Sequence, residues 1–110
     1  MLALPGKARV FLHNEPTDMR KSFEALGILV EQVFQEEISS GAYFVFLNRH
    51  KDRMKVLYWD GDGLVIWYKR LEKGSFACKK KGSAIITRRE FLMLLEGVIP
   101  QKIHKRYILQ

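Results

Sequence analysis

Two segments of the sequence, residues 49–55 and 68–73, carry residue types that bind nucleic acids. Both contain basic side chains, and the second also contains a tyrosine. In residues 49–55 the basic residues alternate with others, so that most project from one side of a strand. Basic groups neutralise phosphates, and aromatic rings stack on bases. The predicted nucleic-acid-binding residues are Arg49, Lys51, Arg53, Lys55, Tyr68, Lys69, Arg70 and Lys73. The alternative interpretation is a solvated basic rim without a ligand.

Arg20 and Lys21 are a second candidate contact for a partner or ligand. They fall in the first turn of a predicted helix, where cations oppose the helix dipole. A salt bridge to Glu24 or to another carboxylate explains them equally well, and the spacing does not decide between the two interpretations.

The sequence predicts no catalytic residue, no metal site and no cofactor. The three histidines, His13, His50 and His104, lie in different predicted elements without acidic or thiol partners at ligand spacing. Asp60 and Asp62 could hold magnesium with a distant carboxylate, but Asp-Gly between two apolar runs is foremost a hairpin turn.

A single cysteine, Cys78, excludes an internal disulfide framework and a cysteine-based zinc site. Three lysines follow it, a setting that favours a reactive thiol if the side chain is exposed, but a structural cysteine is the favoured interpretation. The first residues lack the pattern of a signal peptide, and the apolar runs are too short to cross a bilayer. We expect a cytoplasmic protein without membrane contact.

The predicted elements are strands at residues 8–12, 42–48, 53–60 and 63–70, a weaker strand around Phe76, and two helices. A long N-terminal helix opens at Thr17 and Asp18 and fades near residues 36–37, with an apolar stripe that includes Phe23, Leu26 and Val30. A capping box at residues 87–90 opens a short C-terminal helix. The fold class is α+β, a small single domain in the order β-α-β-β-β-β-α with an antiparallel meander.

The Asp-Gly turn fixes the register of the central hairpin. Pairing Trp59 with Leu64 places Lys55 opposite Tyr68 and Arg53 opposite Arg70. Both hairpin faces are apolar near the turn, which predicts a sheet covered on both sides there. The two tryptophans, Trp59 and Trp67, are interpreted as core residues.

Composition supports one small domain with a basic surface. The chain has 110 residues, 47% of them hydrophobic, which suffices for one core. Its net charge is +7, and the excess is uneven. Residues 1–48 have four basic and six acidic residues, a balance of −2, whereas residues 49–110 have fifteen and six, a balance of +9. A polyanion is therefore expected to contact the second half.

Several ordered blocks resemble one known family. The blocks are TDMRKSF at 17–23, YFVFLNR at 43–49, DRMK at 52–55, YWDGDG at 58–63, WYKRLEKG at 67–74 and LLEG at 94–97. Together they are similar to the TnpB-type (Orf2-like) accessory proteins of the bacterial insertion-sequence family numbered sixty-six. The resemblance covers residues 5–98 and leaves a basic tail at 99–110; it departs from the family after Phe76, where Ala77, Cys78 and three lysines follow.

The resemblance implies a non-catalytic accessory factor of DNA transposition, encoded beside a separate DDE-type transposase. Its expected partners are the ends of the insertion sequence and that transposase. The alternative is a protein-interaction module of the same machinery without direct DNA contact. Exposed strand edges would also permit a homodimer.

Overall fold

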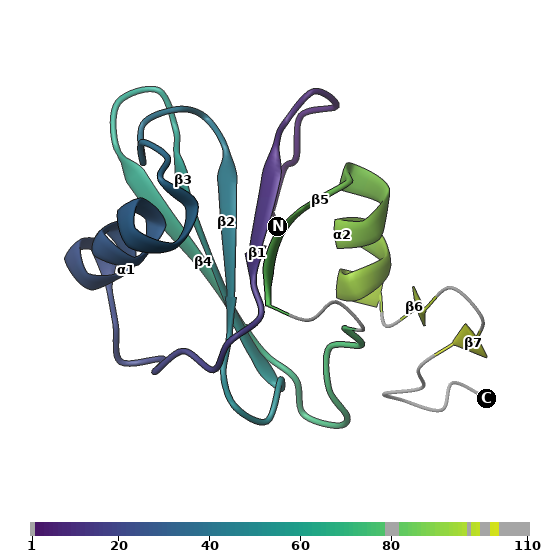
Figure 1. Cartoon of the computed structure of the whole chain (residues 1–110). Helices are drawn as coiled ribbons and strands as arrows, with labels where there is room; N and C mark the ends of the chain where they lie inside the picture. The colour runs from purple at the N-terminus through teal and green to yellow at the C-terminus, as the bar shows by residue number, and fades with distance from the viewer. Residues whose placement is uncertain (1, 79–81, 97, 100–101, 104–110) are drawn as a thin grey trace.

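The computed structural model describes residues 2–78, 82–96, 98–99 and 102–103, which form a small α+β domain (Figure 1). In chain order the elements are β1 (Val10–His13), α1 (Phe23–Leu29), the π-helical segment η1 (Val30–Phe34), β2 (Tyr43–Leu47), β3 (Arg53–Trp59), β4 (Leu64–Arg70), β5 (Ser83–Ile86), α2 (Arg88–Glu96), β6 (Val98–Ile99) and β7 (Lys102–Ile103). The small β6–β7 pair after α2 has no counterpart in the predicted order.

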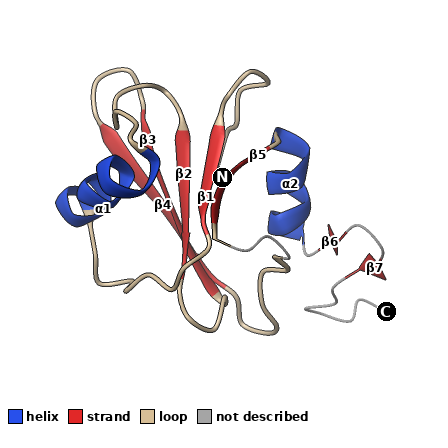
Figure 2. Cartoon of the chain, viewed as in Figure 1, coloured by secondary structure: helices blue, strands red, loops and turns tan. Residues whose placement is uncertain are grey.

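The five-stranded sheet has the order β4-β3-β2-β1-β5 (Figure 2). β2, β3 and β4 form the predicted antiparallel meander. β1, however, pairs in parallel with β2, and β5 adds antiparallel to the far side of β1. The predicted meander is therefore present in β2–β4, whereas the strand order is not the chain order and the parallel pairing of β1 was not predicted. The helix between β1 and β2 returns the chain to the end of the sheet where it started, which makes the two strands parallel.

The first helix is shorter than predicted, because it begins at Phe23 and not at Thr17. Thr17 is buried, and its backbone N–H donates to the carbonyl of Leu47 at 2.8 Å, which ties it to the end of β2. Asp18 accepts a hydrogen bond from the Arg20 N–H at 2.9 Å and closes a local turn. Such side-chain hydrogen bonds compete with helix formation. Phe23, which was expected on the core stripe, is 44% exposed.

The strand predicted around Phe76 is a loop, and the strand in this part of the chain is β5. The N–H of Leu71 donates to the carbonyl of Asp52, and that of Phe76 donates to the carbonyl of Lys51, each at 2.7 Å. These bonds fold residues 71–76 back onto the turn before β3, and they bury the Phe76 side chain. The three lysines at 79–81 and the part of the basic tail from residue 104 lie outside the described residues.

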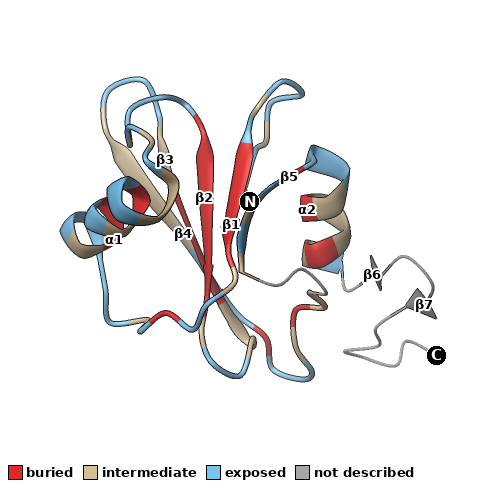
Figure 3. Ribbon diagram, viewed as in Figure 1, coloured by how far each residue is buried: buried red, intermediate tan, exposed pale blue. Residues whose placement is uncertain are grey.

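The sheet has an apolar layer on each face, as the hairpin pattern predicted (Figure 3). α1 and η1 cover one face with Leu26 and Val30, which pack with Phe44 and Leu57. α2 covers the other face with residues such as Phe91. β2 is buried along its whole length between these layers.

The predicted hairpin register and the predicted capping box are both confirmed. Lys55 is paired with Tyr68, and Arg53 with Arg70. At the start of α2, Glu90 Oε1 accepts a hydrogen bond from the Thr87 N–H at 2.8 Å, and Thr87 Oγ1 accepts one from the Glu90 N–H at 3.0 Å. Within the described part of the chain, none of the helices is long and apolar enough to cross a membrane.

A basic and aromatic hollow at one end of the sheet

A tight turn between β2 and β3 forms one side of the site and carries Arg49 and His50. Asn48 organises it: its Oδ1 accepts hydrogen bonds from the N–H groups of Asp52 and Arg53, each at 3.0 Å. Its Nδ2 donates to Asp52 Oδ1 at 2.6 Å. Arg49 and His50, at the tip of the turn, are exposed to solvent. The turn is thus held by side-chain hydrogen bonds beneath a basic tip.

The segment that precedes α1 lies beside this turn and carries Arg20. The Arg20 guanidinium donates to both carboxylate oxygens of Asp18, and its shortest distance is 2.7 Å. This hydrogen-bonded pair lowers the pKa of Asp18 to about 2 and raises that of Arg20. Of the two interpretations of Arg20, the salt bridge is therefore present, but with Asp18 and not with Glu24.

These segments enclose a hollow of about 580 Å³ together with β3 and β4. Four of the predicted contact residues line it: Arg20, Arg49, Arg53 and Tyr68. They come from three separate parts of the chain, the segment before α1, the β2–β3 turn with the start of β3, and β4, so the fold brings together side chains that are far apart in sequence. The complete lining is Thr17, Asp18, Met19, Arg20, Asn48, Arg49, His50, Arg53 and Tyr68.

The charge of this hollow is positive. Three arginines and one carboxylate line it, and the carboxylate of Asp18 is already paired with Arg20. Among the described residues, neither Arg49 nor Arg53 has a carboxylate within ion-pair distance. Their guanidinium groups can therefore bind an anionic ligand without breaking an ion pair.

Lys55 is placed differently from the surface position that its spacing suggested. It is only 8% exposed, and its Nζ donates to the backbone carbonyl of Lys21 at 2.7 Å. The same Nζ lies 4.9 Å from the centre of the Tyr68 ring. Lys55 thus links the segment before α1 to the aromatic ring of the hollow, with its ammonium group inside the protein.

The other predicted contact residues lie outside the lining of the hollow. Arg70 is opposite Arg53 at the end of the hairpin, and its guanidinium lies 3.7 Å from the carboxylate of Glu72. Lys69 points to the α2 face, because alternate residues of β4 face opposite sides. Lys73 is exposed in a loop, and Lys51 is half-buried in the turn before β3. Lys21 is exposed, and its carbonyl holds Lys55.

Five residues of the lining were not predicted as contacts: Thr17, Asp18, Met19, Asn48 and His50. Asn48 has a recognisable signal, since an asparagine at the end of a strand favours a turn built on its side chain. His50 and Met19 have none, because only the three-dimensional arrangement brings them to the hollow.

Two of the residues considered for catalysis or metal binding, His13 and Asp60, have structural roles, and His104 lies outside the described residues. His13 is buried, and its Nδ1 is hydrogen-bonded to Ser83 Oγ at 2.6 Å between β1 and β5. Burial lowers the pKa of His13. Asp60 closes the β3–β4 turn, where its N–H donates to the carbonyl of Gly63 at 2.8 Å. The described residues contain no group of three potential ligands that could hold a metal ion.

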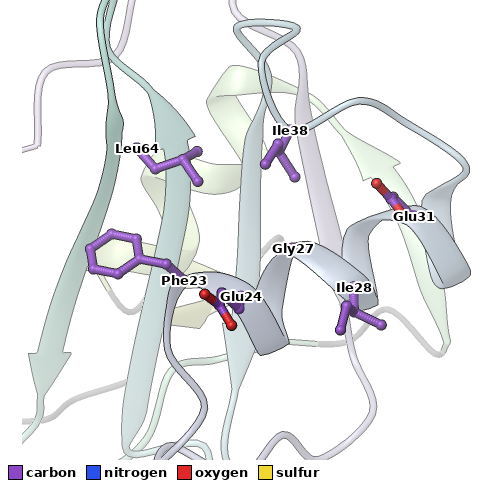
Figure 4. Close-up of a pocket in the computed structure, with 7 residues that line it drawn as sticks. All are labelled: Phe23, Glu24, Gly27, Ile28, Glu31, Ile38 and Leu64. Atoms are coloured by element: carbon purple, nitrogen blue, oxygen red, sulfur yellow. The ribbon is translucent and has the colours of Figure 1, made fainter.

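A second surface, on α1, is apolar. It is a groove of about 280 Å³ beside the helix, and Figure 4 shows its side chains. Ile28 is 55% exposed here, a large apolar area for a solvent-facing helix. Two carboxylates, Glu24 and Glu31, belong to its border. The lining residues are Phe23, Glu24, Gly27, Ile28, Glu31, Ile38 and Leu64.

Comparison with known proteins places the chain in a family. Residues 8–105 match the family described as IS66 Orf2 like protein. Two proteins of Sinorhizobium fredii (strain NBRC 101917 / NGR234) are similar to the chain. The uncharacterized protein y4jC is 32% identical over 92 residues, 82% of this chain and 79% of that protein. The uncharacterized protein y4hO is 32% identical over 100 residues, 89% and 87% of the two chains.

No solved structure matches the chain at a significant level. The family match covers the sheet, both helices and every residue of the basic hollow; it starts at residue 8 and continues past residue 98, where the resemblance was expected to end. The chain therefore belongs to the IS66 Orf2-like family, whose members are accessory proteins associated with transposition.

Proposed function

We propose that this protein is a non-catalytic accessory factor of transposition that binds DNA of its insertion sequence through the hollow. In this proposal Arg49 and Arg53 contact phosphates of the DNA, and Arg20 lies beside them in the hollow. The observation that carries the proposal is the convergence of three arginines and an exposed tyrosine on one concave surface. Lys51, Arg70 and Lys73 extend the positive surface around it, and Lys55 supports it from inside, whereas Lys69 adds its charge on the opposite face of the sheet. The protein acts in the cytoplasm, where its DNA is.

The facing pair Arg53 and Arg70 supports an anionic ligand at this end of the sheet. Like charges directly opposite each other on neighbouring strands are destabilising. Among the described residues, Arg70 has the Glu72 carboxylate at 3.7 Å, and Arg53 has none within ion-pair distance. A phosphate beside Arg53 would relieve this repulsion, and a bidentate guanidinium contact favours phosphate over other anions.

Charge reversal tests the proposal. The variant Arg49→Glu/Arg53→Glu should lose binding to a labelled terminal-repeat DNA, measured by fluorescence anisotropy. The matched control is Lys7→Glu/Arg89→Glu, which changes the net charge equally at two exposed residues away from the hollow. We expect the control to retain most of the affinity. Equal losses in both variants would show that net charge, and not the hollow, drives binding.

The apolar groove on α1 supports a second contact, with the DDE-type transposase of the same element. The apolar lining of the groove is complementary to apolar side chains, and the carboxylates of Glu24 and Glu31 at its border are complementary to basic ones. Burial of Phe23 and Ile28 would supply the apolar part of the binding energy. We propose that the transposase presents such a segment to this groove.

Co-purification with the transposase tests this contact. Ile28→Glu should prevent it, whereas Ile85→Glu, at an exposed isoleucine of β5, should not. The variant Glu24→Lys/Glu31→Lys should also weaken the complex, because it reverses the charge at the borders of the groove. A complex that tolerates all these changes would contradict docking at the groove.

A further inference from the structure

Tyr68 has a partly exposed ring, and it lines the same hollow as three arginines. It lies on β4, at the edge of the sheet, and its side chain is 48% exposed. It lines the hollow between Arg53 and the segment that carries Arg20. About half of this side chain remains open to solvent, which leaves part of an aromatic ring available to a ligand with an aromatic or apolar face.

The ring is also held in place from inside the protein. The Lys55 Nζ lies 4.9 Å from the centre of the ring, and the carbonyl of Lys21 fixes this ammonium group at 2.7 Å. Lys55 and Tyr68 are directly opposite each other on β3 and β4. A ring that is fixed in this way loses little conformational entropy when a ligand stacks on it.

The two chemistries of the hollow match different parts of a nucleotide. Guanidinium groups bind phosphates, and an aromatic ring stacks on a base. In a duplex the faces of the bases are covered by their neighbours, and only their edges and the phosphates are accessible. In a single strand the faces of the bases are free. The volume of about 580 Å³ lies within the range of about 300–1,000 Å³ typical of small-molecule sites.

We infer that the hollow binds single-stranded DNA, with one base stacked on Tyr68 and the neighbouring phosphates on Arg49 and Arg53. This inference rests on the proposed function and specifies its ligand. The Asp18 carboxylate does not oppose the phosphates strongly, because Arg20 pairs with both of its oxygens. Lys55 acts as a positioning residue, since it contacts the ring and not the DNA.

The test uses the full chain with a short oligothymidine that contains one 2-aminopurine, and with a duplex of equal length. Wild-type protein should bind the single strand more tightly and quench 2-aminopurine, the signature of stacking. Tyr68→Ala should weaken single-strand binding about 5- to 150-fold and abolish the quenching. Tyr68→Phe should keep both properties. The matched control is Ile85→Ala, which removes an exposed apolar side chain outside the hollow and should leave binding unchanged.

Tyr68→Leu provides a second variant of similar bulk without a π-system, should Tyr68→Ala lower the melting temperature. It too should lose the quenching. The inference is overturned if all Tyr68 variants bind like wild type, or if duplex and single strand bind equally without quenching. If the inference fails in this way but Arg49→Glu/Arg53→Glu abolishes DNA binding, the proposed function stands. Only the assignment of single-stranded DNA as the ligand is then wrong. If the wild-type protein binds neither DNA, both the inference and the proposed function are wrong.

Discussion

The ammonium group of Lys55 lies between two parts of the hollow, 2.7 Å from the carbonyl oxygen of Lys21 and 4.9 Å from the centre of the Tyr68 ring. It is the one lysine that the described structure records among its buried polar or charged residues. A buried ammonium that is hydrogen-bonded and faces an aromatic ring satisfies its charge locally. Lys55 therefore fixes the entry to α1 and the ring of Tyr68 at the same time.

Lys55→Met should destabilise the protein by about 1–3 kcal/mol. Methionine keeps the apolar stem, but the hydrogen bond to the Lys21 carbonyl and the contact of the ammonium with the Tyr68 ring are lost. Urea unfolding followed by circular dichroism gives the free energy of unfolding. Lys69→Met, at an exposed position of β4, is the matched control and should stay within about 0.5 kcal/mol of wild type. Equal stability of both variants would show that the Lys55 contacts are not structural.

Asn48→Ala should weaken both the fold and DNA binding. The N–H groups of Asp52 and Arg53 lose their shared acceptor, which costs about 1–3 kcal/mol. The turn then no longer holds Arg49 beside the hollow. Asn14→Ala should cost less, because Asn14 Oδ1 is buried without a hydrogen-bond partner among the described residues. Unfolding and anisotropy measurements on both variants test this order, and the reverse order would contradict it.

The hairpin shows what the sequence could predict. The Asp-Gly turn at residues 60–61 and the alternating pattern around it determine the register from Arg53 to Arg70, and the structure has that register. The convergence of Arg53 and Tyr68 follows from it. Both facts depend on local chemistry within a few residues of the turn.

What the sequence could not predict depends on contacts between distant segments. Alternation places Lys55 on the same face as Arg53, but whether that face is covered depends on residues 17–22, which follow another strand. The parallel pairing of β1 with β2 and the position of β5 are equally non-local. Thr17 was predicted as a helix cap from its type alone, whereas its N–H bonds to Leu47, thirty residues away.

Stability should decrease as the pH is lowered through the titration of His13. Burial lowers the pKa of this histidine below its ordinary value of 6.5, although Glu15 partly opposes the shift. The unfolded chain then binds more protons than the folded one, so the free energy of unfolding falls as the pH drops through 6.5 toward the lowered pKa. Above 6.5 the effect is absent.

Unfolding of wild type and His13→Gln between pH 5 and pH 8 isolates this contribution. The wild-type curve should fall more steeply than that of the variant below about pH 6.5. Nuclear magnetic resonance titration of the imidazole gives the folded pKa directly. A pKa above 6.5 would contradict the structural account of His13.

The capping box of α2 should contribute to stability. Thr87→Ala removes the acceptor of the Glu90 N–H and should cost about 1 kcal/mol. Because α2 carries the buried Phe91, the loss appears in the global unfolding transition. Arg89→Ala, in the same turn, should change the free energy of unfolding by less than about 0.5 kcal/mol. A Thr87→Ala protein as stable as Arg89→Ala would contradict the cap.

The central claim is that Arg49 and Arg53 contact phosphates, and the salt dependence of binding tests it most directly. Each neutralised phosphate adds about 0.7 to the log–log salt slope for a single strand and about 0.9 for a duplex. Arg49→Gln/Arg53→Gln should therefore reduce the slope by about 1.4 or 1.8. Lys7→Gln/Arg89→Gln should leave it unchanged. An unaltered slope in the first variant, or an equal reduction in both, would contradict phosphate binding at the hollow.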